Sequence, residues 1–486
     1  MCAIAGVMMF HDFEKTAELQ YWLLYHLQHR GPDSAGIVVR RSDGTYKVHR
    51  GSGTIDTVFY NQDFRSSVWH GAQAIGHARY TTSGSTDQRA TKRKTPAAAQ
   101  PIKGIFRGEP FWMAFNGNLS PACYAELVER VGRHHASEEG SSSISDTELM
   151  VKDIEKTPED TFEDALYSVS SYWRGAFSLI FLYRDCMLAL RDQFGFRPME
   201  FGKNKFGYIL ASEDNVFDVT KFPQSEKLFS IKPGQFLRIK RNGTNDITVE
   251  LLDWFTNKES AFCAFEYVYF SRFDSTLGEV RVALLRKELG RQLAREQPPP
   301  PGMDFVVDVP DSGRHAAEGY AEEAHLPFTA SAIQRLHGAG RSFLLPLKSL
   351  RKEAIENKLQ VVPECVRGKR IIVVDDSIVR GNVAPRVVHL LKQAGAEEVH
   401  FRVASPPIRH GCRYGIDTYR IEHELIARRF PTVPDIIQEI NRETSERYGA
   451  YTLDSLEYLS LEGMKQVWRG KEQLCTACWT GNYPVN

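Results

Sequence analysis

The stretch GKRIIVVDDSIVRGNVAPRVVHLLKQAGAEEVHFRVAS, residues 368–405, decides the fold of the second half of this chain. Its apolar runs at 371–374 and 399–403 are typical of strands buried on both faces, and a helical pattern lies between them. MDFVVDVP at 303–310 and a helical pattern at 315–325 show the same order upstream. We therefore predict an α/β domain with a parallel sheet that binds ligands at the carboxyl ends of its strands.

Two polar segments lie at such strand ends. Asp375 and Asp376 end one strand in VVDDSIVRGN, and the small residues after them precede a helix N-terminus, an arrangement that suits a phosphate. Paired carboxylates suit neighbouring ribose hydroxyls, directly or through Mg²⁺. Because acids at strand ends are often only solvated, the pair alone is weak support for a site. The second segment is the turn PDSG at 310–313.

The first half of the chain has short apolar or aromatic runs separated by turn residues, a pattern typical of strands. SDTELMVKDIEK at 145–156 predicts a helix, because Ser145 and Glu148 have the spacing of a capping box. The pattern changes between 245 and 262, so we predict two domains, 2–245 and 255–486. The runs of strand length are AIAGVMM, AIGHARY, FWMAFNG, FSLIFLY and GYILASE.

Charge and composition narrow the class of protein. The chain has 61 basic and 61 acidic side chains, so it offers no electrostatic reason to bind nucleic acid or an anionic membrane. No apolar run approaches the roughly 20 residues of a membrane span. The N-terminal residues MCAIAGVMMFHDFEK lack the basic start and long apolar stretch of a signal peptide. We therefore expect a cytoplasmic enzyme without a membrane or nucleic-acid partner.

A cysteine stands at position 2. Once Met1 is removed, its thiol is a nucleophile and its own α-amine, with an unperturbed pKa near ~8, can act as the base. An incidental small residue is the more frequent explanation of such a position. Three other segments favour function, since Arg79 offers a cation for a carboxylate, Asp146 an anion for an ammonium group, and the Asn116-Gly117 turn an oxyanion site.

These segments together resemble a known family. MCAIAGV, HRGPDSAG, GHARYTTSG, NGN and SDTE, in this order, are similar to the class II glutamine amidotransferase domain, an N-terminal-nucleophile hydrolase with an αββα sandwich. The resemblance implies that Cys2 is both nucleophile and base, and that Asn116 and the Gly117 N–H form the oxyanion hole. It also implies that glutamine is bound by Arg30, Arg79, Thr82 and Asp146.

VVDDSIVRGN resembles the phosphoribosyl-diphosphate signature of type I phosphoribosyltransferases, and the PDSG turn is similar to their pyrophosphate loop. The resemblance implies a parallel-sheet transferase domain in which Asp375 and Asp376 also hold Mg²⁺. The residues implied to bind phosphoribosyl diphosphate are Asp311, Ser312, Gly313, Arg341, Asp375, Asp376, Ser377, Arg380, Gly381 and Asn382.

A class II glutaminase followed by such a transferase resembles the glutamine phosphoribosyl-diphosphate amidotransferase family over essentially the whole chain. The resemblance implies ammonia transfer from glutamine to phosphoribosyl diphosphate, giving 5-phosphoribosylamine, glutamate and pyrophosphate at the start of purine synthesis. It further implies inhibition by purine nucleotides and a homo-oligomer, either a tetramer or a dimer.

The cysteines suggest a cofactor. Cys475 and Cys478 form a CxxC, which alone is ambiguous among zinc, redox and iron–sulfur use. One subgroup of the family holds a [4Fe–4S] cluster with four cysteines, whose sequence contexts match Cys263, Cys412, Cys475 and Cys478. The alternative is four unrelated buried thiols. The remaining three, Cys123, Cys186 and Cys365, are expected to be packing residues.

The chain departs from the family pattern at several positions. Pro32, Phe115 and Ala3 replace the usual residues beside the glutaminase site, so we expect altered packing or rate. Val383 removes a hydroxyl donor to the 5′-phosphate, a loss of roughly 1.5–3 kcal/mol. The loop at 335–339 lacks its usual Lys-Asn-Arg-Tyr run, and Lys348 replaces a neutral residue.

These departures leave two alternatives to the transfer of ammonia to phosphoribosyl diphosphate. The first is a paralogue that keeps the glutaminase but aminates a different phosphosugar acceptor. The second is a weakly catalytic protein that senses nucleotides or redox state. The intact set of Cys2, Asp375 and Asp376 argues against the second alternative.

Overall fold

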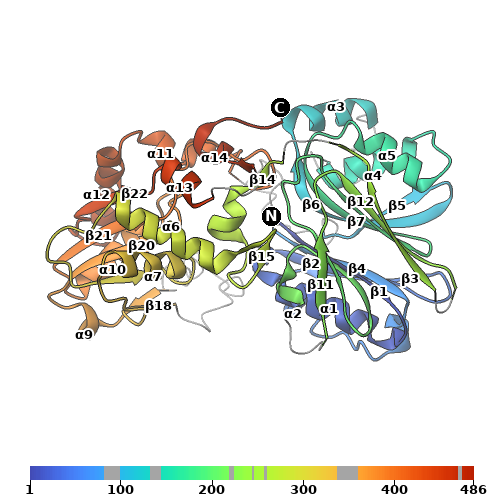
Figure 1. Ribbon diagram of the computed structural model, residues 1–486, viewed down its shortest axis with the longest axis horizontal. Helices are drawn as coiled ribbons and strands as arrows, with labels where there is room; N and C mark the ends of the chain where they lie inside the picture. Colours follow the sequence, from blue (N-terminus) through green and yellow to red (C-terminus); the bar gives the residue numbers. More distant parts are fainter. Residues whose placement is uncertain are drawn as a thin grey trace.

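The computed structural model describes residues 1–80, 99–131, 144–217, 224–243, 246–256, 260–335, 359–416, 418–468 and 473–485. The two halves of the chain lie side by side, and the N-terminus lies where they meet (Figure 1). None of the described helices combines the length and apolar character that a membrane crossing requires.

The first half is built on two stacked sheets. The first has seven strands in the order β11-β9-β10-β1-β4-β2-β3, and the second has six in the order β13-β12-β8-β7-β6-β5. The strands of the first are β1 (Ala3–Met9), β2 (Ser34–Arg40), β3 (Tyr46–Ser52), β4 (Gln73–Arg79), β9 (Glu200–Lys203), β10 (Gly207–Ala211) and β11 (Glu226–Ser230). Those of the second are β5 (Ile102–Phe106), β6 (Glu109–Leu119), β7 (Gly175–Tyr183), β8 (Cys186–Arg191), β12 (Gln235–Arg241) and β13 (Ile247–Asp253).

Apolar side chains on facing strands, among them Ile4, Ile75 and Ile180, are fully buried between the two sheets. The outer face of the first sheet packs against α1 (Thr16–His26) and α2 (Ile55–Val58). The outer face of the second packs against α3 (Pro121–Val131), α4 (Asp146–Lys156) and α5 (Phe162–Ser170). The predicted αββα sandwich is thus confirmed.

Strand β13 extends the second sheet beyond the predicted domain end at residue 245. It pairs with β12 from Ile247↔Arg241 to Asp253↔Gln235, so the predicted first domain of 2–245 leaves out the last strand of its own sheet. The Asn-Gly turn near residue 243 closes a β-hairpin, as such turns commonly do. We propose that the division between the domains lies after Asp253.

The second half contains the predicted parallel sheet. Its four strands are all parallel and lie in the order β17-β20-β21-β22. One face packs against α6 (Val282–Glu296), α7 (Arg314–Glu323) and α13 (Leu461–Val467), and the other against α10 (Ala384–Gln393) and α12 (Val433–Tyr448). The strands are β17 (Phe305–Asp308), β20 (Arg370–Asp375), β21 (Glu398–Val403) and β22 (Ser455–Tyr458).

Short elements complete the second half. They are β14 (Phe262–Cys263), a π-helical turn at Glu266–Phe270, β15 (Thr276–Leu277), β16 (Val280–Arg281), β18 (Ile333–Arg335), β19 (Leu359–Val361), α9 (Pro363–Val366), α11 (Ile426–Arg429), β23 (Leu474–Cys475) and α14 (Ala477–Thr480).

Candidate active sites

Cys2 lies just before β1 and is held through its backbone. Its N–H donates to Asn116 Oδ1 at 3.0 Å, and its carbonyl oxygen accepts from Arg30 Nε at 3.1 Å. Its Sγ lies 3.7 Å from the carbonyl oxygen of Tyr80. Met1 is buried, with 1% of its surface exposed, and burial lowers the pKa of its α-amine to about 6.

Asn116 and Gly117 lie in β6, beside the nucleophile. Because Asn116 Oδ1 accepts from Cys2, the Nδ2 group of the same amide remains, and it is buried with no hydrogen-bond partner among the described residues. Gly117 has φ +154°, and a Cβ there would lie 1.9 Å from the carbonyl oxygen of Ala176. A buried donor of this kind suits an oxyanion that forms during reaction.

Charges of opposite sign reach the same small pocket. Its lining includes Cys2, Arg79 at the end of β4, Gly117 and Asp146. Asp146 begins α4, and one of its oxygens accepts the Leu119 N–H at 3.0 Å. The structure therefore brings together the predicted nucleophile, oxyanion donor, cation and anion. The predicted ligand Thr82 lies outside the described residues.

The predicted cap of α4 is present at this pocket. Ser145 is the N-cap residue, and its Oγ accepts the Glu148 N–H, while Glu148 Oε2 accepts the Ser145 N–H at 2.8 Å. This reciprocal pair fixes the first turn of the helix, and with it the backbone of Asp146.

The thiol of Cys2 is acidic for a buried group. Burial alone would raise its pKa, but the neighbouring His77 imidazole and the terminal amine lower it, to about 6. His77 is fully buried in β4, and its Nε2 lies 3.1 Å from the carbonyl oxygen of Phe115. A cysteine with this pKa is mostly thiolate at neutral pH, which is its nucleophilic form.

The second candidate site lies at the carboxyl ends of β17 and β20, where the sequence placed it. Asp375 and Asp376 are both buried, and Ser312 Oγ donates to Asp375 Oδ1 at 3.4 Å. A Cβ on Gly313 would lie 2.4 Å from the carbonyl oxygen of Val374, so the PDSG turn lies directly against the end of β20.

The charged forms of the two acids at this site are disfavoured by burial. Burial, with the adjacent Asp376 carboxylate, raises the pKa of Asp375 well above its usual range, and burial raises that of Asp376 to about 6. Asp376 Oδ2 is buried and has no hydrogen-bond partner among the described residues. Hydroxyl donors or a divalent cation would satisfy such a pair, so the residues fit the predicted Mg²⁺.

The loop after the acids leads into α10. Gly381 has φ +82°, and the N-cap residue of the helix, Val383, makes no side-chain cap. The first backbone N–H groups of a helix without such a cap are available to an anion. Two other predicted ligands, Ser377 and Asn382, belong to this loop. Two more form ion pairs with neighbouring side chains, Arg380 with Glu424 and Asp311 with Arg335. The predicted ligand Arg341 lies outside the described residues.

The four predicted cluster cysteines lie together and are all buried. Cys263 and Cys475 are register partners in the parallel pair β14–β23. The Cys478 thiol donates toward Cys412, which lowers the pKa of Cys412 to about 6 and raises that of Cys478.

No group of three or more His, Cys, Asp or Glu side chains in the described ranges could hold a metal ion. A four-iron cluster, in contrast, binds its four cysteines at four separate iron atoms. The arrangement of Cys263, Cys412, Cys475 and Cys478 is compatible with the cluster in its burial and in the nature of its donors.

Comparison with known proteins finds relatives along the whole chain. Residues 87–218 match the family described as glutamine amidotransferase domain. The amidophosphoribosyltransferase of Archaeoglobus fulgidus is 36% identical over 494 residues, which cover 100% of this chain and 98% of the relative. That of Bacillus subtilis is 35% identical, with 100% of this chain and 94% of the relative covered. This chain belongs to the amidophosphoribosyltransferase family.

A solved structure of the family supports the same assignment. The glutamine phosphoribosylpyrophosphate amidotransferase of Bacillus subtilis, in complex with ADP and GMP, superposes with a TM-score of 0.83 at 34% identity, covering 100% of this chain and 98% of that chain. The predicted family, the predicted pair of folds and the prediction of an enzyme are confirmed.

Several residues at the amidophosphoribosyltransferase sites were not singled out from the sequence. His77 lies in the quoted segment GHARYTTSG, but a buried strand histidine is more often structural. Gln100 accepts the Phe115 N–H at 2.8 Å and donates to Thr147 Oγ1 at 2.9 Å, which braces the oxyanion strand against α4. Burial and the charges of Asp376 and Tyr80 raise the pKa of Tyr269 to about 12.

Proposed function

We propose that this member of the family releases ammonia from glutamine at Cys2 and transfers it to phosphoribosyl diphosphate at Asp375 and Asp376. The products are 5-phosphoribosylamine, glutamate and pyrophosphate, as in the first step of purine synthesis. Asn116 carries this proposal. One atom of its amide holds the Cys2 backbone, and the other is a buried donor that has no acceptor among the described residues.

In the first half, the Cys2 thiolate attacks the side-chain amide carbon of glutamine. The oxygen of that amide becomes an oxyanion that accepts from Asn116 Nδ2 and the Gly117 N–H. Arg79 and Thr82 bind the α-carboxylate and Asp146 binds the α-ammonium group. The α-amine of Cys2, which has taken the thiol proton, gives that proton to the leaving nitrogen, so collapse of the intermediate releases ammonia and leaves a thioester on Cys2, which water then hydrolyses to glutamate.

In the second half, Asp375 and Asp376 hold the ribose hydroxyls of phosphoribosyl diphosphate. The PDSG turn, Asp311 to Gly313, binds the pyrophosphate through its backbone, and the loop Ser377–Asn382 binds the 5′-phosphate at the N-terminus of α10. Arg341 is a further ligand. Mg²⁺, held by the two acids, would neutralise charge on the diphosphate leaving group.

We further propose a [4Fe–4S] cluster on Cys263, Cys412, Cys475 and Cys478. Such a cluster would join β14 to the C-terminal segment that carries β23 and α14, and so would stabilise this region of the second half. Purine nucleotide inhibition and a homo-oligomer, tetramer or dimer, are also proposed, and the ADP and GMP in the Bacillus subtilis structure support the former. The cytoplasmic location stays a prediction.

Glutamine-dependent pyrophosphate release, with phosphoribosyl diphosphate and Mg²⁺, tests this function. We expect the purified protein to form glutamate and pyrophosphate in equal amounts. Cys2→Ala should abolish this reaction and keep the reaction with added ammonia. Glutamine hydrolysis without pyrophosphate release would instead favour a different acceptor, and the absence of both reactions would favour the sensor.

A further inference from the structure

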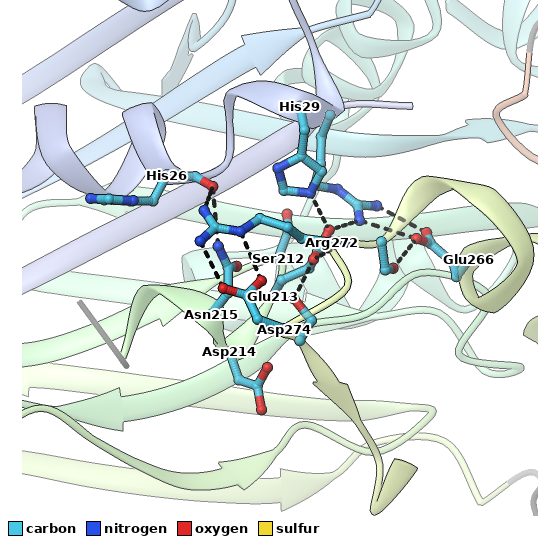
Figure 2. Close-up of polar contacts among 12 residues, drawn as sticks. His26, His29, Ser212, Glu213, Asp214, Asn215, Glu266, Arg272 and Asp274 are labelled. Atoms are coloured by element: carbon cyan, nitrogen blue, oxygen red, sulfur yellow. Dashed lines mark hydrogen bonds and ion pairs between the residues drawn. The ribbon is translucent and has the colours of Figure 1, made fainter. Parts of the chain in front are cut away.

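A buried chain of charges joins the two halves of the molecule beside Cys2. Arg30 and Glu213 come from the first half, and Glu266 comes from the π-helical turn of the second half. Figure 2 shows the contacts of Glu213 and Glu266 where the two halves meet. We propose that Glu266 is a positioning residue for the Cys2 nucleophile, because it holds the Arg30 guanidinium that donates to the Cys2 carbonyl.

Every nitrogen of the Arg30 guanidinium has a protein acceptor, so this fully buried side chain supports Cys2 and does not bind glutamine as the family resemblance implied. Nε donates to the Cys2 carbonyl at 3.1 Å, and the two terminal nitrogens donate to Glu266 at 3.0 and 2.9 Å. One terminal nitrogen also donates to Glu213. The side chains of Arg30, Glu213 and Glu266 are all 0% exposed. Since a guanidinium is a rigid plane, the two-point contact with Glu266 sets the direction in which Nε points.

Glu213 has a different set of partners and cannot replace Glu266. It accepts from His29 Nε2 at 2.8 Å, from the Arg272 N–H at 2.9 Å and from Ser275 Oγ at 2.5 Å. Figure 2 shows Glu213 between His29 and the segment that carries Arg272. Because its oxygens are shared among these donors, Glu213 contacts a single Arg30 nitrogen. That one contact would not by itself prevent the guanidinium from rotating.

Charge balance adds a second reason. Glu266 also lies 3.4 Å from Arg197, which is 0% exposed and donates to the Tyr414 carbonyl at 3.0 Å. Two buried guanidiniums therefore face two buried carboxylates. Replacement of Glu266 by a neutral residue would leave one carboxylate for two guanidiniums, and Arg30 would move toward Glu213 and away from the Cys2 carbonyl.

The role of Glu266 rests on the proposed function of Cys2 and specifies it further. Cys2 and Arg30 belong to the first half, but Glu266, the carboxylate that orients Arg30, belongs to the second half. Glu266 acts on the Cys2 backbone through Arg30, whereas glutamine is proposed to be bound by Arg79 and Asp146 at the pocket that Cys2 also lines, so loss of Glu266 would change the reaction of bound glutamine more than its binding.

The test is Glu266→Gln, assayed for pyrophosphate release with glutamine and, separately, with ammonia. We expect kcat with glutamine to fall about 10- to 100-fold, as for a small misplacement of a reacting group, with KM for glutamine and the ammonia reaction within about twofold of the parent. Labelling of Cys2 by a diazo-ketone analogue of glutamine should slow by the same factor. Arg30→Lys, which keeps the charge and loses the two-point contact, should show the same pattern if Glu266→Gln does not fold.

Glu439→Gln is the matched control, since Glu439 is also buried and pairs with two arginines, Arg429 and Arg442, far along the chain. It should leave both reactions unchanged. An unchanged glutamine kcat in Glu266→Gln and Arg30→Lys would overturn the inference, as would an equal fall in the glutamine and ammonia reactions. If Cys2→Ala still uses glutamine, the proposed function itself fails, whatever the result with Glu266.

Discussion

The Asn116 side chain uses its two polar atoms for different partners: Oδ1 accepts the Cys2 N–H at 3.0 Å, and the buried Nδ2 has no partner in the described parts of the chain. The amide orientation follows from this contact, since only an oxygen can accept from an N–H. The hydrogen bond from the Cys2 N–H therefore fixes the Asn116 amide so that its free donor, Nδ2, lies beside the Cys2 nucleophile.

Asn116→Ala should lower kcat for glutamine by about 10²–10³-fold, because it removes an oxyanion donor. KM for glutamine should change little and the ammonia reaction should not change. Steady-state kinetics with both nitrogen donors measures this. Asn242→Ala, at an exposed asparagine bonded to Asp246, is the control. Equal losses with both nitrogen donors would count against an oxyanion role.

His77→Gln should raise the pKa of the Cys2 thiol from about 6, because the imidazole beside it is a main cause of the lowering. Rates of iodoacetamide labelling against pH, with Cys2 followed by mass spectrometry, measure the change. The chain should be expressed with methionine aminopeptidase inhibited, so that Met1 remains. At pH 7 the parent Cys2 should react fast, whereas a thiol of ordinary pKa is only a few per cent thiolate. An unmoved pH profile would exclude His77 as the cause.

Asp376→Asn should make the folded protein more stable above pH 6. Burial raises the pKa of Asp376 to about 6, so its contribution to stability is full in acid and is lost as the pH rises through that value. The gain at pH 8 should be at most about 3 kcal/mol and should vanish near pH 4. Urea unfolding at both pH values measures it.

A contrasting variant serves as control for the acid pair. Asp304 has a lowered pKa, because it accepts from the Arg370 N–H and pairs with Lys369. Asp304→Asn should therefore not stabilise the protein at pH 8. Pyrophosphate release should be lost in Asp376→Asn only. A fall in stability of Asp376→Asn at pH 8 would show that the carboxylate is compensated in the folded state.

Cys475→Ser should remove the visible absorbance of an iron–sulfur cluster and lower the midpoint of thermal unfolding. The C-terminal segment would then keep β23 and its hydrogen bonds, such as those from the Arg409 and His410 N–H groups to the Cys478 carbonyl, but would lose the cross-link through the cluster. Cys123→Ser, at a buried thiol that accepts the Arg174 N–H at 3.2 Å, should keep the absorbance. Anaerobic purification with iron and sulfide analysis measures both variants. A colourless parent protein after cluster reconstitution would exclude the cofactor.

Val383→Thr should lower KM for phosphoribosyl diphosphate by about tenfold, because one hydrogen bond to a charged group is worth roughly 1.5–3 kcal/mol. Val383 is 47% exposed at the start of α10, so a hydroxyl fits there without repacking. Val68→Thr, at an exposed valine of the first half, is the control. An unchanged KM would place the 5′-phosphate away from this helix.

The sequence predicted best what depends on local spacing. The capping box of Ser145 and Glu148 needs residues three positions apart, and the parallel strands were visible as continuous apolar runs. The network around Arg30 could not be predicted, because Glu213 and Glu266 are 183 and 236 positions away. Nothing local distinguishes these glutamates from surface acids. Strand β13 was missed because it lies inside the stretch 245–262, which was predicted to be the domain boundary.

The division of charges between the halves limits how freely the two can be exchanged. Arg30, Arg197 and Glu213 precede the boundary after Asp253, and Glu266 follows it. A first half expressed alone would have only the Glu213 carboxylate for the guanidiniums of Arg30 and Arg197. A second half expressed alone would expose the Glu266 carboxylate, which pairs with these guanidiniums in the whole chain. Chimeras built at this boundary should therefore assemble only with a second half that has an acid at the position of Glu266. This one residue thus determines which second halves can pair with a given first half.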